Sequence, residues 1–320
     1  MAVLGTSFAR WRAEALGLDY RAAFERICAM RFGLVRLSAS WREITQFGYG
    51  HLDWLLGEAE RSRQPVLLTV GMKALGWPEF HLPEGMHPAD LAVQRGAVAH
   101  VRDVARRYRD NPTLTAWQIE NEPFNRSGPN SLWIPRPVVR AEAEAVRSVD
   151  RGRPQVVTGF AHFDEDLDRS SSRDQSRWRR RLGLILPAER EALSILRRGD
   201  VLGLDVYRSI GWRDASGRER IAQAAPDQLA RVAFWQRIAR EQGKRFWVTE
   251  AQAEPWEARR QTHADPLSIR PEAIGELVNR LVGIGVETIL LWGSEYWLWR
   301  ADNGDPRWMD AVSLVKTALA

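Results

Sequence analysis

Short apolar runs rich in β-branched residues recur along the chain and alternate with longer stretches that have helical, amphipathic periodicity. The short runs predict strands and the longer stretches predict helices. Strands are expected at 3–8, 34–37, 66–70, 114–119, 155–160, 201–206, 245–249 and 288–292. Helices are expected at 18–30, 51–62, 89–109, 137–149, 188–198, 226–241, 270–285 and 306–318.

This alternation predicts the fold. Strands separated by helices pair in parallel, and eight such units fit a closed (β/α)8 barrel, the TIM barrel, better than an open sheet. No linker divides the sequence, so residues 1–320 are expected to form a single catalytic domain. In such barrels the loops after the strands build the active site. The long segments that follow strands here are 72–88, 120–136, 161–187, 207–225 and 250–269.

Composition and charge exclude several function classes. Hydrophobic residues make up 44% of the chain, which is enough for a large core. No apolar run reaches the ~18 residues that a membrane helix needs, so no membrane span is expected. A net charge of +5 would suit a polyanion, but nearly all basic residues are arginine and they are spread along the chain. We therefore expect no nucleic-acid partner, and we expect the dense patch at 177–181 to be a solvated face.

Cysteine and histidine usage argues against metal and redox chemistry. Cys28 is the only cysteine, which excludes intrachain disulfides and cysteine-based metal sites. The histidines show no HExxH spacing, and there is no P-loop, dinucleotide fingerprint or Gly-x-Ser-x-Gly elbow, so no cofactor or metal is expected.

The N-terminus lacks the basic start and long apolar stretch of a signal peptide. Because a strand is predicted to begin almost at residue 3, a secreted location is expected if a leader was cut away, and a cytoplasmic one otherwise. The sequence is silent on oligomeric state.

Two glutamates stand where predicted strands end. Glu122 closes the run Trp117-Gln-Ile-Glu-Asn-Glu at the fourth strand, and Glu250 follows Val248-Thr at the seventh. These strands are expected on opposite sides of the barrel, so that the two carboxyl groups face each other across its mouth. Glycoside hydrolysis needs two carboxyl groups that flank the scissile bond. The pair therefore favours a glycosidase.

These motifs resemble glycoside hydrolase clan A, which includes cellulase-like (family 5-like), mannanase and β-galactosidase families. The resemblance spans nearly the whole chain and rests on Asn121-Glu122-Pro123 and on Glu250. It implies a retaining glycosidase that cleaves an oligosaccharide, polysaccharide or other β-glycoside by double displacement. It also implies that Glu122 is the general acid/base and Glu250 the nucleophile.

The resemblance implies roles for four further residues. A strand-two arginine, here Arg36, would keep the nucleophile ionised. Asn121 would bind the sugar 2-hydroxyl, a contact that strengthens in the transition state. Tyr207 would orient the nucleophile, and Trp292 would stack under the reacting sugar.

Other residues have competing interpretations. Glu120 stands where many clan members carry a histidine, shares a strand face with Glu122 and is the main rival for the acid role. Arg36 could pair with Glu120 instead, and Asp205 is expected to be structural. Tryptophans in strand-end segments are candidate sugar platforms, with plain packing as the alternative: Trp41, Trp77, Trp256 and Trp297.

Three other functions remain open. A non-catalytic carbohydrate-binding barrel would need one carboxylate to be misplaced. A transglycosylase would use the same residues with sugar acceptors in place of water, and a polyanion-binding barrel would show a steep dependence on salt. A retaining mechanism predicts carboxyl groups about 5–5.5 Å apart, whereas ~6.5–9.5 Å indicates inversion. The sequence specifies neither the sugar nor endo or exo action.

Overall fold

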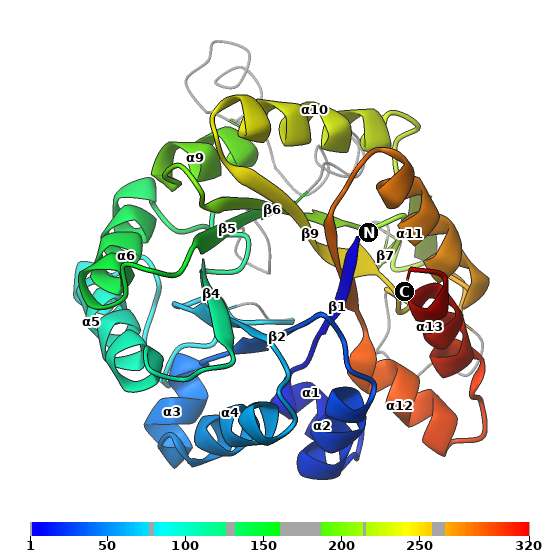
Figure 1. Ribbon diagram of the computed structural model, residues 1–320, viewed down its shortest axis with the longest axis horizontal. Coiled ribbons are helices and arrows are strands. Elements are labelled where there is room, and N and C mark those ends of the chain that lie inside the picture. The colour runs from blue at the N-terminus through cyan, green and yellow to red at the C-terminus, as the bar shows by residue number, and fades with distance from the viewer. Residues whose placement is uncertain are drawn as a thin grey trace.

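The fold is a closed parallel barrel. The computed structural model describes residues 2–76, 80–125, 132–160, 187–213, 216–257 and 266–319. Within these ranges, eight parallel strands close in the order β1-β10-β9-β6-β5-β4-β3-β2, and helices surround them (Figure 1). The predicted (β/α)8 barrel is confirmed. Trp77, the patch at 177–181 and most of the segment after the fifth strand lie outside the described residues.

The barrel strands lie where the sequence predicts them. They are β1 (Val3–Ser7), β2 (Leu34–Ser38), β3 (Val66–Val70), β4 (Leu114–Ile119), β5 (Gln155–Phe160), β6 (Val201–Val206), β9 (Arg245–Gln252) and β10 (Thr288–Trp292). The main difference is β9, which runs on beyond its predicted end at residue 249.

Each predicted helix is also present. These helices are α2 (Tyr20–Ala29), α4 (Gly50–Arg61), α5 (Leu91–Tyr108), α6 (Arg136–Val149), α9 (Ala188–Ile195), α10 (Gln228–Glu241), α11 (Glu272–Gly283) and α13 (Arg307–Ala318). In the described part of the chain, none of them is long and apolar enough to cross a membrane.

Further elements occupy segments where the sequence predicts none. They are α1 (Arg10–Ala15), α3 (Trp41–Phe47), α12 (Ser294–Asp302) and a hairpin of β7 (Ser209–Arg213) with β8 (Glu219–Gln223). The long segment 207–225 that follows a strand therefore contains a hairpin that the sequence did not predict. The added helices are short, so their apolar periodicity extends over too few turns to stand out.

Side chains fill the barrel interior in layers, because alternate residues of each strand point inward. The lower layer, here called the apolar layer, comprises Leu34, Leu67, Ala116, Val156, Val201, Trp247 and Leu290. Two residues further along the strands lies the polar layer: Ser7, Arg36, Thr69, Gln118, Thr158, Thr249 and Trp292. The larger core cluster packs the outer face of the barrel against the helices.

Two local features shape the polar layer. A Cβ added to Gly203 of β6 would lie 2.8 Å from side-chain atoms of both Thr158 and Thr249, so glycine leaves room for both threonines. In β9 the register shifts by one residue after Val248, which indicates a β-bulge. The bulge lets two successive residues, Thr249 and Glu250, both contact groups at the mouth.

Candidate active site

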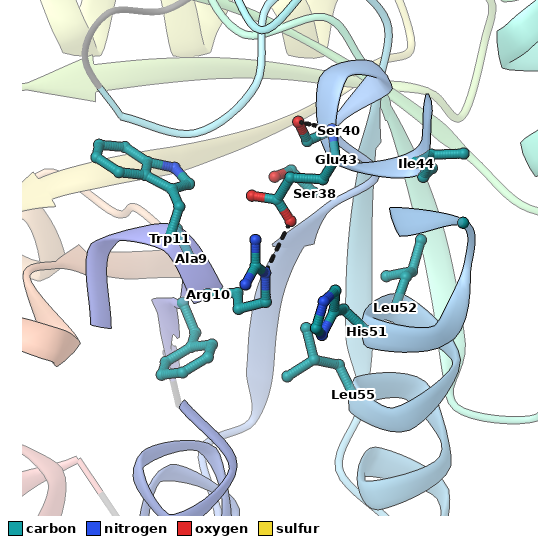
Figure 2. Close-up of a pocket in the computed structure, with 12 residues that line it drawn as sticks. Ala9, Arg10, Trp11, Ser38, Ser40, Glu43, Ile44, His51, Leu52 and Leu55 are labelled. Carbon is teal, nitrogen blue, oxygen red and sulfur yellow. Dashed lines mark hydrogen bonds and ion pairs between the residues drawn. The ribbon is translucent and has the colours of Figure 1, made fainter. Parts of the chain in front are cut away.

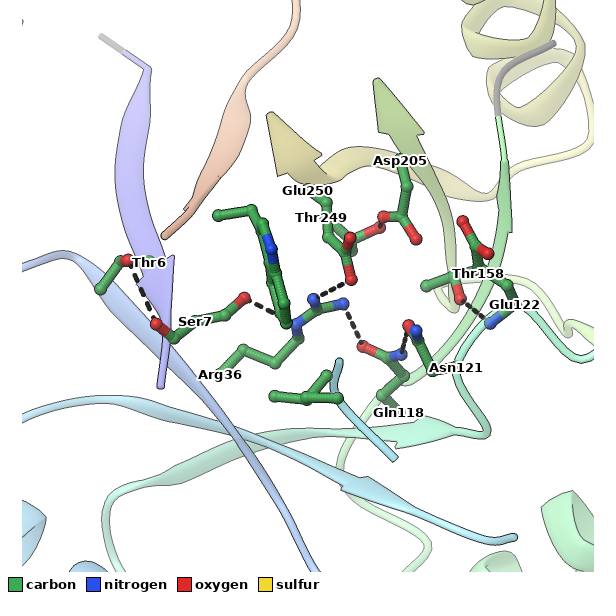
Figure 3. A network of polar contacts seen from close by, with 12 residues as sticks. Thr6, Ser7, Arg36, Gln118, Asn121, Glu122, Thr158, Asp205, Thr249 and Glu250 are labelled. Carbon is green, nitrogen blue, oxygen red and sulfur yellow. Dashed lines mark hydrogen bonds and ion pairs between the residues drawn. The ribbon is translucent and has the colours of Figure 1, made fainter. Parts of the chain in front are cut away.

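Glu250 lies in a buried hydrogen-bonded network at the carboxyl ends of the strands (Figure 3). Its Oε1 accepts a hydrogen bond from Arg36 Nη2, and its Oε2 accepts one of 2.6 Å from the Tyr207 hydroxyl. The exposed fractions are 5% for Glu250, 0% for Arg36 and 1% for Tyr207. Water therefore screens the attraction between Arg36 and Glu250 little. Burial and the charge of Glu250 raise the pKa of Tyr207 well above its ordinary value, which keeps the hydroxyl a donor.

Arg36 is held by the polar layer in turn. Its Nε donates to Ser7 Oγ at 3.0 Å, and its Nη1 donates to Gln118 Oε1 at 3.3 Å. Gln118 Nε2 donates to Asn121 Oδ1 at 3.3 Å, so contacts run without a break from Glu250 to the turn after β4. Sequence reasoning missed Ser7 and Gln118, although both stand near the ends of predicted strands.

Glu122 lies in a strained turn after β4. Glu120 and Glu122 have φ values of 62° and 46°, a region that non-glycine residues seldom adopt unless their surroundings enforce it. The Glu122 amide donates to Thr158 Oγ1 at 2.8 Å, and Asn125 Nδ2 donates to Glu122 Oε2 at 3.0 Å. Lys73 Nζ donates to the Glu122 carbonyl oxygen at 2.9 Å. Hydrogen bonds from β5, from the turn itself and from the loop after β3 thus hold the turn in this strained conformation.

Glu120 faces a different part of the molecule. Its two carboxyl oxygens accept the backbone amides of Met72 and Lys73 at 2.7 and 2.6 Å, and the side chain is fully buried. Gly71 makes this approach possible, since a Cβ there would lie 2.2 Å from the Glu120 Cδ atom. The structure pairs Arg36 with Glu250, so the alternative pairing of Arg36 with Glu120 is wrong.

A second carboxyl group, Glu142 of α6, is buried beside Glu120. Burial raises the pKa of Glu120 to about 7. Burial and the charge of Glu120 raise the pKa of Glu142 well above its ordinary value. Neither oxygen of Glu142 receives a hydrogen bond from the described residues, so Glu142 is the member of the pair that carries the proton.

The strands that carry the two proposed catalytic glutamates are not opposite each other. On one side only β5 and β6 separate β4 from β9, whereas β3, β2, β1 and β10 separate them on the other. The expectation of opposite sides is corrected accordingly. The consequence is that Thr158 of β5 and Asp205 of β6 lie on the shorter path between Glu122 and Glu250, as Figure 3 shows.

Trp292 is brought beside the network. Its ring centroid lies 4.5 Å from Arg12 Cζ and 5.7 Å from Arg36 Cζ, within the range of cation–π attraction. Its indole Nε1 donates to Glu254 Oε1 at 2.8 Å. The ring orientation is therefore determined by charged groups around it.

A second buried charged cluster adjoins Trp292. Arg12 Nη2 donates to both oxygens of Glu254 at 2.7 and 2.5 Å, and Arg12 Nε lies 3.6 Å from Glu295 Oε2. Burial alone would lower the pKa of Arg12, but the two carboxylates raise it. Sequence reasoning missed this cluster because Arg12 and Glu295 lie on α1 and α12. Among the described residues, no group of three or more histidine, cysteine and acidic side chains could hold a metal ion.

Aromatic side chains surround Tyr207. The Trp256 ring meets it edge-on, with centroids 5.0 Å apart, and Phe160 stacks on it at 5.9 Å. Trp256, Phe160 and Trp11 are half-buried and belong to one apolar cluster with Tyr207 and Trp292. Half-exposed aromatic rings suit stacking on the apolar faces of sugars. The sequence singled out Trp256 but not Trp11 or Phe160.

Two other candidate platforms are not brought to this cluster. Trp41 stacks on His100 of α5, with centroids 5.2 Å apart and an interplanar angle of 12°. Trp297 is fully buried, and its indole nitrogen donates to the Ala253 carbonyl oxygen at 2.6 Å. Both contacts are those of packing residues.

Two of the pockets lined by described residues lie away from this network. One, of about 20 Å³, lies beside the Arg10–Glu43 pair, whose Nε and Oε2 atoms are 3.0 Å apart (Figure 2), and it has room for about one water. The other is a groove of about 630 Å³ whose lining includes Phe80, Leu82 and Met86 from the β3 loop. Of these two, the groove is the one large enough for a small organic ligand.

Comparison with known proteins supports the fold. No protein-family model matches the sequence, and no curated protein is significantly similar to it. Among solved structures, a β-galactosidase from the psychrophilic Marinomonas ef1 superposes with a TM-score of 0.61 at 13% identity, covering 99% of this chain and 59% of that one. An exo-β-1,4-mannosidase from Opitutaceae bacterium strain TAV5 has a TM-score of 0.60 at 14% identity, covering 91% and 52%.

A family 1 β-glucosidase from Thermotoga maritima matches over nearly equal lengths, with a TM-score of 0.58, 11% identity and coverage of 95% and 98%. The chain spans 50–59% of the length of several β-galactosidase chains that it matches. The resemblance to clan A barrels that the sequence implies is therefore confirmed for the fold.

Proposed function

We propose that the protein is a retaining glycoside hydrolase that cleaves β-linked glycosides, with Glu250 as nucleophile and Glu122 as general acid/base. The observation that carries the proposal is the environment of the Glu250 carboxylate. Its carboxylate is buried at the barrel mouth, and Arg36 and Tyr207 each bind one of its oxygens. This arrangement favours an ionised, fixed carboxylate, as nucleophilic catalysis requires.

In the first step a Glu250 oxygen attacks the anomeric carbon while Glu122 protonates the departing glycosidic oxygen. One C–O bond forms as the other breaks, and the proton leaves with the alcohol. Negative charge on Glu250 favours the neutral form of Glu122 at this stage. Asn125, which donates to Glu122 Oε2, helps to orient that carboxyl group.

In the second step Glu122 takes a proton from water, and the resulting hydroxide displaces Glu250 from the sugar. The ester has no net charge, so the repulsion that disfavoured an ionised Glu122 is gone. Asn121 is proposed to bind the sugar 2-hydroxyl and Trp292 to border the reacting sugar. Trp256, Trp11 and Phe160 supply partly exposed aromatic surface nearby. No dissociable cofactor takes part in this mechanism.

The decisive test is Glu250→Ala, assayed against aryl β-galactosides, β-glucosides and β-mannosides, the sugars named by the structural neighbours. Turnover should be abolished, and external azide should restore cleavage with release of an α-glycosyl azide. A matched control is Glu257→Ala. It removes a carboxylate that lies outside the Glu250 network and accepts a hydrogen bond from the Ser268 hydroxyl. Undiminished hydrolysis by the Glu250 variant would contradict the assignment.

The same assays separate the other functions. Transfer to added sugar acceptors in preference to water would indicate a transglycosylase. Saturable binding of a β-glycan by wild-type protein without turnover would indicate a non-catalytic carbohydrate-binding barrel.

A further inference from the structure

Asp205 is a third carboxyl group in the same network. It is the penultimate residue of β6 and pairs across the strands with Glu250 at the β9 bulge. Its side chain is fully buried, and Thr249 Oγ1 donates to its Oδ1 at 2.6 Å. In Figure 3 its carboxyl group lies between those of Glu250 and Glu122.

The second oxygen of this carboxyl group is the unusual feature. Asp205 Oδ2 is buried and has no hydrogen-bond partner among the described residues. A buried carboxylate oxygen without a donor is costly, because nothing replaces the water that it loses. The same oxygen in protonated form would instead be a hydrogen-bond donor in need of an acceptor. Since Thr249 donates to Oδ1, the proton belongs on Oδ2.

The surrounding charges favour the same state. The groups that interact with Asp205 are Glu250 from β9, Glu122 from the β4 turn, Arg36 from β2 and Tyr207 at the end of β6. Burial, followed by the charges of Glu250 and Glu122, raises the pKa of Asp205 well above its ordinary value, whereas Arg36 lowers it. Arg36 already pairs with Glu250, so its charge does not neutralise a second carboxylate.

We propose that Asp205 is a positioning residue that stays neutral and keeps its Oδ2 hydrogen available, during the reaction, to whichever catalytic glutamate carries the negative charge. The proposal rests on the proposed function. In the resting site the charge is on Glu250. In the glycosyl-enzyme Glu250 is esterified, Glu122 has given up its proton, and the charge is on Glu122. The two catalytic glutamates thus carry one negative charge between them in both states, and the proton of Asp205 is never transferred.

Asp205→Asn is the informative variant, because an amide is also neutral and can also donate. The kcat should fall by no more than ~10-fold, whereas Asp205→Ala, which has no donor, should lose ~10²-fold or more. The alkaline limb of the kcat/KM profile should stay within about half a pH unit of wild type in Asp205→Asn. If Asp205 were charged, its removal would move that limb to lower pH by about one unit or more and overturn the proposal.

A second measurement does not depend on turnover. The infrared difference spectrum of wild type minus Asp205→Asn, at neutral pH, should contain the C=O stretch of a protonated carboxylic acid. The bands of an ionised carboxylate in that difference would overturn the proposal. If wild type cleaves no glycoside, the proposed function fails, while the spectrum still decides the charge of Asp205.

Thr249→Val tests the same proposal with Asp205 left in place, in case the Asp205 variants fail to fold. It keeps the side-chain shape beside Gly203 but removes the donor to Oδ1, so the acid band should remain at a shifted frequency. An unshifted band would contradict the inferred orientation, in which Oδ1 accepts and Oδ2 carries the proton.

Discussion

The apolar layer and the polar layer of the barrel are built by the same strands, two residues apart, yet they differ in almost every physical property. The apolar layer consists of seven hydrophobic side chains with at most 5% exposure and contains no titratable group. The polar layer, only one inward-facing position higher, contains Arg36, Gln118 and Thr158, which hold Glu250 and the Glu122 turn. One inward-facing position along each strand therefore separates the apolar layer from the residues that contact the proposed catalytic glutamates.

The difference teaches how stability and function are divided in this barrel. Each buried aliphatic side chain of the apolar layer stabilises the fold by roughly 1.5–3 kcal/mol. The Arg36–Glu250 pair is also buried, but replacing a buried ion pair with apolar residues is often neutral or stabilising by ~1–4 kcal/mol. Its presence is therefore better explained by a functional requirement than by stability. Substitutions in the two levels should separate these properties.

The largest effect is expected at the mouth, from Glu122→Ala. Loss of general acid catalysis should lower kcat/KM by ~10²–10⁴-fold for alkyl glycosides. Activated aryl glycosides, whose leaving groups need little protonation, should suffer far less in the first step. Equal losses for both substrate classes would argue against Glu122 as the acid. Thermal unfolding should change little, because the turn is held through its backbone by Thr158 and Lys73.

The opposite outcome is expected in the apolar layer, from Leu290→Ala. Leu290 fills the space above Gly5, where an added Cβ would lie 2.3 Å from its Cδ2. Its truncation should lower the free energy of unfolding by about 2–5 kcal/mol, measured by urea denaturation. The kcat/KM per folded molecule should stay near wild type. Leu314→Ala is the control, since Leu314 is 72% exposed and should cost little.

The sequence predicts the strands well because they follow from local patterns. Each strand run is short, apolar and bounded by turns, so Leu34, Val66 or Thr288 begins a strand in both prediction and structure. Glu122, Glu250, Arg36 and Tyr207 could be proposed as site residues because they stand at strand ends or match clan motifs.

The remaining contacts of the mouth depend on three-dimensional register. The bulge that turns both Thr249 and Glu250 toward the mouth has no sequence signature. The Arg12–Glu254 pair joins residues 242 positions apart through a helix too short to predict. Asp205 also looked structural in the sequence, because its relation to Glu122 depends on β5 and β6 lying between β4 and β9.

A smaller effect, on stability and its pH dependence, is expected at the Glu120–Glu142 pair behind the mouth. Burial raises the folded-state pKa values of both glutamates, that of Glu120 to about 7 and that of Glu142 well above its ordinary value. From about pH 4.5 upward, the folded protein therefore retains protons that the unfolded chain releases. Stability should therefore fall as pH rises through this window. Glu142→Gln removes one buried ionisable group, so it should flatten the dependence and stabilise by on the order of 1 kcal/mol at pH 8.

Urea denaturation between pH 5 and 8 checks this prediction. Glu144→Gln, on the same helix but with a half-exposed carboxylate, is the control and should leave the pH dependence unchanged. A steeper fall of stability with pH in Glu142→Gln than in wild type would contradict the assignment of the retained proton to Glu142.

The smallest effect should distinguish two of the tryptophans that the sequence proposed as platforms, Trp256 and Trp41. Trp256 lies against Tyr207 with part of its ring exposed, so Trp256→Ala should raise KM by ~2–10-fold through lost stacking of ~0.5–1.5 kcal/mol. The kcat should change less, because the Tyr207–Glu250 hydrogen bond remains. Trp41→Ala should leave KM unchanged, since that ring is stacked on His100 between helices. A KM increase in the Trp41 variant but not in the Trp256 variant would place the bound sugar on the β2 side of the barrel and away from the aromatic cluster around Tyr207.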